Sequence, residues 1–129
     1  MPIGFVLYMS STDSLDQTIR AIDAFTKERD WEQFHSLKNL MASVSIEASE
    51  LNETLQWSNP SAEVVCENPE LIAEIADELA DVMAYCLRIC SVLDLDPVQI
   101  IQTKIEKNRL KYPVEISKGS SAKYTAYEK

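Results

Sequence analysis

The chain has 129 residues, 46% of them hydrophobic, and only two glycines and five prolines. This composition fits one compact helical domain and excludes a disordered chain or a turn-rich β fold. The formal net charge of −9 excludes a general binder of polymeric nucleic acid, because such proteins present basic surface to phosphates.

Residues 1–13 begin with an apolar run, "MPIGFVLYM", that lacks the basic start and the cleavage site of a signal peptide. We therefore expect a short N-terminal extension. No segment approaches ~20 uninterrupted apolar residues, so we expect no contact with a membrane. The three cysteines form no C-x-x-C pair, which indicates a reducing, cytoplasmic location.

Apolar spacing predicts a first helix over residues 14–29 and a second over residues 37–56. The first helix has three candidate N-caps: Thr12, Asp13 and Ser14. The expected inward face of the second helix consists of Leu40, Met41, Val44, Leu51 and Leu55. The Asn-Pro pair in "SNPSAE" should stop that helix, so residues 57–68 are interpreted as a connector.

A third helix is predicted over residues 69–93, beginning at Pro69, a residue suited to a first helical turn. Its second half, residues 82–93, has Arg88 and Ser91 as its only plainly polar members. A helix that is apolar on nearly every side is buried on nearly every side. Because a four-helix monomer offers too few neighbours for this, the pattern predicts a homo-oligomeric interface.

A fourth helix should start at Pro97, with Asp96 as its N-cap, and end near Tyr112 because Pro113 follows. Residues 114–129 are polar and lack a helical period, so we expect a mobile tail, although its two tyrosines could order it against a partner subunit or a ligand. The predicted organisation is an all-α, four-helix bundle-like, homo-oligomeric domain over residues 14–113, between the extension and the tail.

Two pairs of carboxylates share one spacing. Glu47 and Glu50 lie three residues apart on the second helix, and Glu78 and Asp81 repeat this spacing on the third. If these helices pack antiparallel, the pairs converge, and without a cation they would repel each other. Mg²⁺, with Mn²⁺ as the alternative, prefers such oxygen ligands. The competing interpretation is a solvated acidic face; a di-iron bundle is disfavoured because it needs two Glu-x-x-His motifs and His35 is the only histidine.

Aromatic and basic residues accompany the acidic pairs. Trp31 and Trp57 stand at either end of the second helix and could stack on a nucleobase, or they could simply cap the core. On the fourth helix, Lys104, Asn108 and Tyr112 follow i, i+4, i+8 spacing, and Lys107, Arg109 and Lys111 add positive charge. This cluster suits anionic oxygens, although a solvated last turn would also place cations there.

Four segments in order, "RDWEQFHSLKNL", "EASELNETLQW", "DELADVMAY" and "KIEKNRLKYP", resemble the MazG-like all-α nucleoside triphosphate pyrophosphohydrolases. The similarity covers roughly residues 15–124 and is greatest to the dCTP pyrophosphatase-like branch. One departure is that Ser49 stands where relatives commonly have glycine in the E-x-G-E-L motif, which could alter base preference.

The resemblance implies that Glu47, Glu50, Glu78 and Asp81 bind Mg²⁺, and that the enzyme converts a (deoxy)nucleoside triphosphate to monophosphate and pyrophosphate. The expected substrate is dCTP or a modified pyrimidine analogue, and the expected biological role is cleansing of the nucleotide pool. The resemblance also implies a homodimer or homotetramer. One carboxylate, with Glu50 as the candidate, would act as general base. The expected substrate-binding residues are Trp31, His35, Lys38, Asn39, Trp57, Lys104, Asn108, Arg109 and Tyr112.

Two alternatives stay open from the sequence. The chain could be a non-catalytic helical interaction module whose acidic face is solvated. It could also be a pyrophosphohydrolase of another substrate, such as dUTP or a nucleotide sugar.

Overall fold

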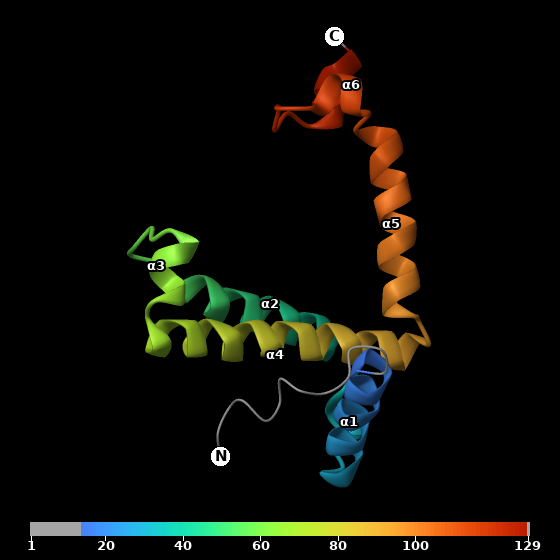
Figure 1. Ribbon diagram of the computed structural model, residues 1–129. Helices are drawn as coiled ribbons and strands as arrows, with labels where there is room; N and C mark the ends of the chain where they lie inside the picture. Colours follow the sequence, from blue (N-terminus) through green and yellow to red (C-terminus); the bar gives the residue numbers. More distant parts are fainter. Residues whose placement is uncertain (1–13, 129) are drawn as a thin grey trace. The chain divides into compact units, whose positions relative to one another are not determined.

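The computed structural model describes residues 14–128, in which every regular element is a helix and no strand occurs. The expected all-α fold is confirmed, and the extension expected at residues 1–13 lies outside the described part. The chain divides into two compact units between Asp94 and Leu95, inside the region expected to be one domain, and each unit is described by itself. The helices of the first unit are α1 (Ser14–Glu28), η2 (Glu32–Phe34), α2 (Leu37–Glu53), α3 (Ala62–Cys66) and α4 (Pro69–Leu93); those of the second are α5 (Pro97–Lys111), α6 (Val114–Ser117) and η3 (Tyr124–Glu128) (Figure 1).

Helix α4 organises the first unit. Helix α2 packs against it and runs in the opposite direction, while α1 and α3 make fewer contacts with it (Figure 1). The start of α4 is set by Asn68, whose Oδ1 accepts a hydrogen bond from the Leu71 N–H at 3.1 Å, and by Pro69 in the first turn. Leu40 of α2 is 1% exposed and is the most deeply buried hydrophobic residue described.

The segment after α2 differs from the prediction. Helix α2 ends at Glu53, and residues 54–57 form a turn instead of a further helical turn. The region interpreted as a connector contains the short helix α3, whose N-cap Ser61 accepts a hydrogen bond from the Val64 N–H. Five residues are too few to show a helical period, and tertiary contact with α4 decides the conformation.

In the second unit, Asp96 caps α5 as predicted, because its Oδ1 accepts from the backbone N–H groups of Val98 and Gln99. The described part of the tail forms two short helices, α6 and η3, which the lack of a helical period did not predict. The rings of Tyr124 and Tyr127 each contact Tyr112 edge-on, with centroids 6.0 Å apart. Aromatic packing on the end of α5 therefore orders a segment that has no apolar period of its own.

The second half of α4 is only partly covered within one chain. Arg88, which is polar, is 7% exposed, whereas Met83 is 54% exposed. Cys90 is buried and Cys86 is exposed. Across residues 14–128, no helix combines the length and the apolar character needed to cross a bilayer.

Candidate functional site

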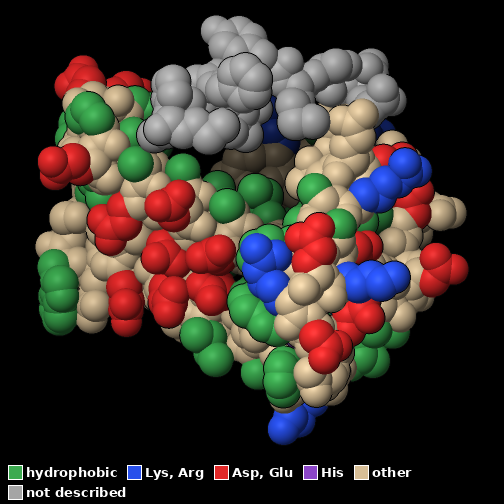
Figure 2. All heavy atoms as spheres, turned by 90° about the horizontal axis from the view of Figure 1, so that it is seen from below, with side chains coloured by type: hydrophobic (Ala, Val, Ile, Leu, Met, Phe, Trp, Pro, Cys, Tyr) green, Lys and Arg blue, Asp and Glu red, His purple; other side chains and the backbone are tan. Residues whose placement is uncertain are grey.

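Three carboxylates from two helices meet in the first unit. Glu47 and Glu50 of α2 and Glu78 of α4 each offer an oxygen, and these oxygens all lie within 4.8 Å of one another. The i, i+3 spacing places the two α2 carboxylates on one face, and the antiparallel packing brings that face to α4. We call these three residues the carboxylate cluster. Figure 2 shows acidic side chains gathered on this part of the first unit.

Two oxygens of this cluster lack a hydrogen-bond partner. Glu47 Oε2 and Glu78 Oε2 are shielded from solvent and have no hydrogen-bond donor. A hydrogen bond with Glu50, desolvation and the neighbouring negative charges raise the pKa of Glu47 to about 7. Desolvation first, and then the charge of Glu50, raise the pKa of Glu78. Shielded carboxylate oxygens without donors fit a hard divalent cation, which supplies the missing positive charge and accepts oxygen ligands.

Asp81, the fourth carboxylate expected at the metal, lies outside the group of three oxygens. It follows Glu78 on α4, and its charge contributes to the raised pKa values of Glu47 and Glu78. Asp81 also lines a neighbouring cavity. It therefore links the carboxylate cluster to that cavity.

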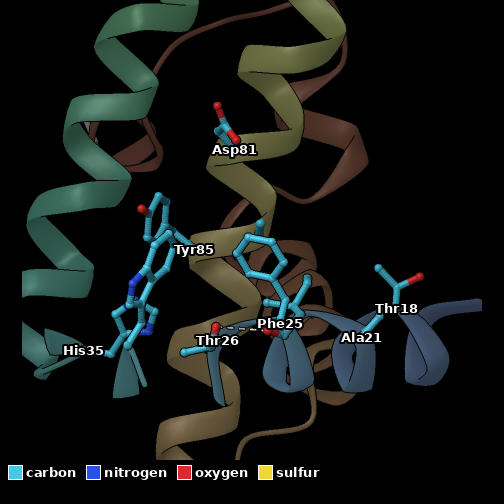
Figure 3. Close-up of a pocket in the computed structure, with 10 residues that line it drawn as sticks. Thr18, Ala21, Phe25, Thr26, His35, Asp81 and Tyr85 are labelled. Atoms are coloured by element: carbon cyan, nitrogen blue, oxygen red, sulfur yellow. Dashed lines mark hydrogen bonds between the residues drawn. The ribbon is translucent and has the colours of Figure 1, made fainter. Parts of the chain in front are cut away.

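The cavity has a volume of about 490 Å³ and lies among α1, α4 and the segment before α2. Figure 3 shows Phe25 of α1 and Tyr85 of α4 directed into the same space. Trp31 contacts Phe25 edge-on, with centroids 5.7 Å apart, and His35 contacts Tyr85 edge-on at 6.4 Å. The lining is mostly apolar and aromatic: Thr18, Ala21, Ile22, Phe25, Thr26, Trp31, His35, Asp81, Ala84 and Tyr85. Such a cavity suits a flat aromatic group; we call it the aromatic cavity.

A smaller cavity of about 240 Å³ shares Trp31, His35 and Tyr85 with the aromatic cavity and adds Asn39 to its lining. The amide nitrogen of Asn39 donates to the Phe34 carbonyl at 3.0 Å. This bond holds the side chain, and the amide oxygen is then the group through which Asn39 could accept a hydrogen bond.

The buried Arg88 contacts His35, one of the residues that line the aromatic cavity. Arg88 Nη1 donates to Asp23 Oδ1 at 2.7 Å, and Arg88 Nε donates to His35 Nδ1 at 3.2 Å. Ser91 Oγ donates to the other oxygen of Asp23 at 2.9 Å. Desolvation, followed by the charge of Arg88, lowers the pKa of His35 against a smaller opposing effect of Glu32. We call Asp23, His35, Arg88 and Ser91 the arginine network.

The remaining predicted site residues lie elsewhere. Trp57 is 90% exposed in the turn after α2 and does not line the aromatic cavity. Lys38 is exposed in the first turn of α2. Four others belong to the second unit: Lys104, Asn108, Arg109 and Tyr112.

Within that unit, these four residues have different surroundings. Lys104 lines an open cavity of about 320 Å³ together with Lys107. Arg109 pairs with Glu106 at 3.4 Å on the surface. Tyr112 ends α5, where its N–H donates to the Asn108 carbonyl at 2.8 Å.

Sequence reasoning did not select Phe25, Tyr85, Asp23 or the site role of Arg88. A signal was present for two of them. Tyr85 follows Asp81 by four residues and so lies on the same face of α4. Arg88 interrupts an apolar segment, where a charge is costly unless it is paired.

Comparison with known proteins gives consistent matches. The model of the MazG-like family matches residues 42–126. The chain is 36% identical over 118 residues to dCTP pyrophosphatase 1 of Bos taurus, covering 90% of this chain and 69% of that protein. It is 38% identical over 111 residues to dCTP pyrophosphatase 1 of Mus musculus, covering 84% of this chain and 65% of that protein.

A solved structure is also similar. The crystal structure of a pyrophosphatase from Archaeoglobus fulgidus DSM 4304 superimposes with a TM-score of 0.71 at 33% identity. The match covers 81% of this chain and 97% of that one. The resemblance predicted from the four sequence segments is therefore confirmed.

Proposed function

The chain belongs to the MazG-like family, and on that premise we propose that it is a Mg²⁺-dependent nucleoside triphosphate pyrophosphatase that acts on dCTP or a modified pyrimidine analogue. The relatives named dCTP pyrophosphatase 1 and the pyrophosphatase of known structure support this class of enzyme over a non-catalytic helical module. The observation that carries the proposal is the position of Asp81, which lines the aromatic cavity and acts electrostatically on the carboxylate cluster.

The carboxylate cluster and Asp81 are the residues that would hold Mg²⁺, with Mn²⁺ as a substitute. The ion would neutralise the charge of the triphosphate and of the leaving pyrophosphate. Glu50 is the exposed member of the cluster, so it is the carboxylate that a water molecule can reach. We assign it the role of general base, which takes a proton from the water that cleaves the anhydride between the α and β phosphates.

The base would occupy the aromatic cavity. Stacking on an aromatic side chain such as Trp31 provides affinity, whereas polar groups at the edge of the base provide the choice among bases. His35 and Asn39 are the polar candidates here. Lys38 and the α5 residues Lys104, Asn108, Arg109 and Tyr112 stay proposed contacts for phosphates and sugar, and Trp57 stays a proposed second stacking surface.

We propose further that the enzyme is a homodimer or homotetramer. Large hydrophobic side chains of α4 and α5 are exposed within one chain, among them Met83, Val92, Ile101 and Leu110. Large apolar side chains left exposed in this number, on each of the two units, are typical of proteins that bury them against another subunit. Sedimentation of a stable ~15 kDa monomer at micromolar concentration would refute this part of the proposal. The free thiols of Cys66 and Cys86 agree with a location in the cytoplasm, where nucleotide pools are kept.

The decisive experiment measures pyrophosphate and monophosphate together across a panel of triphosphates that includes dCTP, 5-methyl-dCTP and dUTP, with and without Mg²⁺. The proposal predicts equimolar products, highest kcat/KM for a cytosine nucleotide, and no turnover after chelation. Turnover of dUTP above dCTP would leave the class of enzyme intact and correct the substrate. Release of inorganic phosphate in place of pyrophosphate would refute the reaction.

A further inference from the structure

The arginine network contains a buried charge that the proposed reaction does not use. The Arg88 side chain is 9% exposed and its nearest carboxylate, on Asp23, is 37% exposed. An ion pair between α1 and α4 needs only the contact between these two groups. The Nε–H of Arg88, however, is directed to an imidazole that lines the aromatic cavity.

This contact decides which nitrogen of His35 carries a proton. A guanidinium is always protonated and has donors only, so the imidazole nitrogen that it contacts must accept. Nδ1 therefore bears a lone pair. A doubly protonated ring would place an N–H against the N–H of Arg88, and the lowered pKa of His35 agrees with a neutral ring. The proton of the neutral ring is then on Nε2.

We propose that Arg88 is a positioning residue: its bond to Nδ1 holds His35 in the Nε2–H tautomer, so that the imidazole offers a hydrogen-bond donor to a base in the aromatic cavity. Asp23 and Ser91 hold Arg88 in position. Asp23 accepts from Arg88 through one oxygen and from Ser91 through the other, which fixes the carboxylate and, through it, the guanidinium. Tyr85 contacts the ring of His35 edge-on and limits its rotation.

A fixed donor has a consequence for the choice of base. The ring nitrogen N3 of cytosine is an acceptor, whereas N3 of uracil and thymine carries a hydrogen and is a donor. An Nε2–H group aligned with N3 would pair with cytosine and oppose the other two pyrimidines. A site built to form such a bond discriminates strongly, because the wrong partner leaves a buried polar group unsatisfied. This inference rests on the proposed function, since it names a determinant of the same site.

The first experiment is independent of activity. Because the chain has one histidine, the ring nitrogens of His35 give a single pair of ¹⁵N signals in the labelled full-length protein. At pH 7.5 we expect Nδ1 to resonate as an unprotonated nitrogen and Nε2 as a protonated one. In Arg88→Lys, which keeps a cation for Asp23 but lacks Nε–H, we expect both signals to move toward an average of the two tautomers. A wild-type protein with the Nδ1–H tautomer, or with averaged signals, would overturn the proposal.

The second experiment compares kcat/KM for dCTP and dUTP. We expect the ratio to fall at least ~10-fold in Arg88→Lys. The matched control is Arg20→Lys, the same substitution at an exposed position of α1, which should keep the wild-type ratio. Equal losses for both substrates in Arg88→Lys would indicate a merely structural ion pair and would overturn the proposal.

A second pair of variants serves if Arg88→Lys does not fold. The amide of His35→Asn can replace Nδ1 as acceptor for Arg88 but does not extend to the position of Nε2, whereas the longer amide of His35→Gln does. We expect His35→Gln to keep more of the dCTP preference than His35→Asn, and the reverse order would overturn the proposal. If the wild-type protein shows the Nε2–H tautomer but hydrolyses no triphosphate, then the proposed function fails and the tautomer assignment to Arg88 stands.

Discussion

The first unit contains two groups of charged side chains that differ in charge balance. The carboxylate cluster contains acidic side chains and no cation, and Glu47 Oε2 and Glu78 Oε2 are shielded without a donor. The arginine network pairs its buried cation with Asp23, and both oxygens of that carboxylate accept hydrogen bonds. Both groups include residues of α4. The same helix therefore carries one group that lacks a cation and one group in which the charges are paired.

This difference in charge balance indicates that the carboxylate cluster and the arginine network have separate roles. A group with balanced charge and satisfied donors stabilises the native geometry, and it requires nothing from outside the chain. A group of anions raises its own pKa values and stays unfavourable until a cation or a proton arrives. We therefore attribute ligand binding and chemistry to the carboxylate cluster, and orientation of neighbouring side chains to the arginine network.

The largest effect is expected from Glu78→Gln. Loss of one carboxylate removes a proposed metal ligand, and turnover of dCTP with Mg²⁺ should fall at least ~100-fold. The stability of the metal-free protein should not fall, because the substitution also removes repulsion within the cluster. Steady-state kinetics and thermal unfolding in chelator test both parts. Glu70→Gln, an exposed substitution in the first turn of α4, is the matched control and should change neither. Near-normal turnover in Glu78→Gln would show that the metal site is assigned wrongly.

Asp23→Asn is expected to lower the stability of the protein, which Glu78→Gln should not do. This change leaves the guanidinium of Arg88 buried without a counter-charge, so the protein should lose about 1–3 kcal/mol of unfolding free energy. Chemical denaturation with and without Mg²⁺ measures the loss, which should be similar in both conditions because the network binds no metal. A loss confined to the Mg²⁺-bound protein would contradict the separation of the two groups.

A smaller effect on binding is expected from removal of a tryptophan. Trp31→Ala and Trp57→Ala should each weaken substrate binding by ~1–3 kcal/mol per lost stacking contact, which raises KM for dCTP more than it lowers kcat. Only Trp31→Ala should also lower the melting temperature, because Trp31 packs on Phe25 whereas Trp57 is 90% exposed. If Trp57→Ala loses kcat at unchanged KM, Trp57 is not a stacking surface.

The sequence predicted the features that depend on local or repeated patterns. The start of α4 follows from Pro69 and that of α5 from Asp96 and Pro97, and the equal spacing of two acidic pairs indicated the helices that carry the carboxylate cluster. These features need only helical geometry and the assumption of antiparallel packing. The position of Glu47, Glu50 and Glu78 could therefore be anticipated, although the displacement of Asp81 toward the aromatic cavity could not.

Features that depend on contacts between distant segments were missed. Asp23 and Arg88 are 65 residues apart, and His35 and Arg88 are 53 apart, so no local period relates them. The order of the tail has a similar origin, because the rings of Tyr124 and Tyr127 pack on Tyr112 at the end of α5. A charge in an apolar segment and tyrosines in a polar tail signal such contacts without specifying the partner.

Metal binding should strengthen as the pH rises, because the pKa of Glu47 is raised. Its pKa is raised to about 7 in the metal-free protein, so below this value a proton competes with Mg²⁺. The folded metal-free protein retains a proton that the unfolded chain loses above its usual value of 4.5, so its stability should fall as the pH rises from 4.5 through about 7. Thermal unfolding at several pH values should show a Mg²⁺ stabilisation that grows up to about pH 7 and then levels off. Stabilisation that is constant from pH 5 to 8 would contradict the shift.

The smallest expected effect is the pH dependence that His35 contributes to stability. Its pKa is lowered from 6.5 in the folded protein, chiefly by desolvation and then by Arg88. As the pH falls below 6.5, the unfolded chain takes up a proton that the folded protein refuses, so stability should decrease until the folded pKa is passed. In the metal-free protein the carboxylate cluster changes the stability with pH in the opposite direction. The contribution of His35 must therefore be measured as a difference between the wild type and a variant without the histidine. His35→Asn removes the only histidine and keeps an acceptor near Arg88. The unfolding free energy of the wild type should therefore drop relative to that of His35→Asn on going from pH 7.5 to pH 5.5, and parallel curves would show that the pKa of His35 is not lowered in the folded protein.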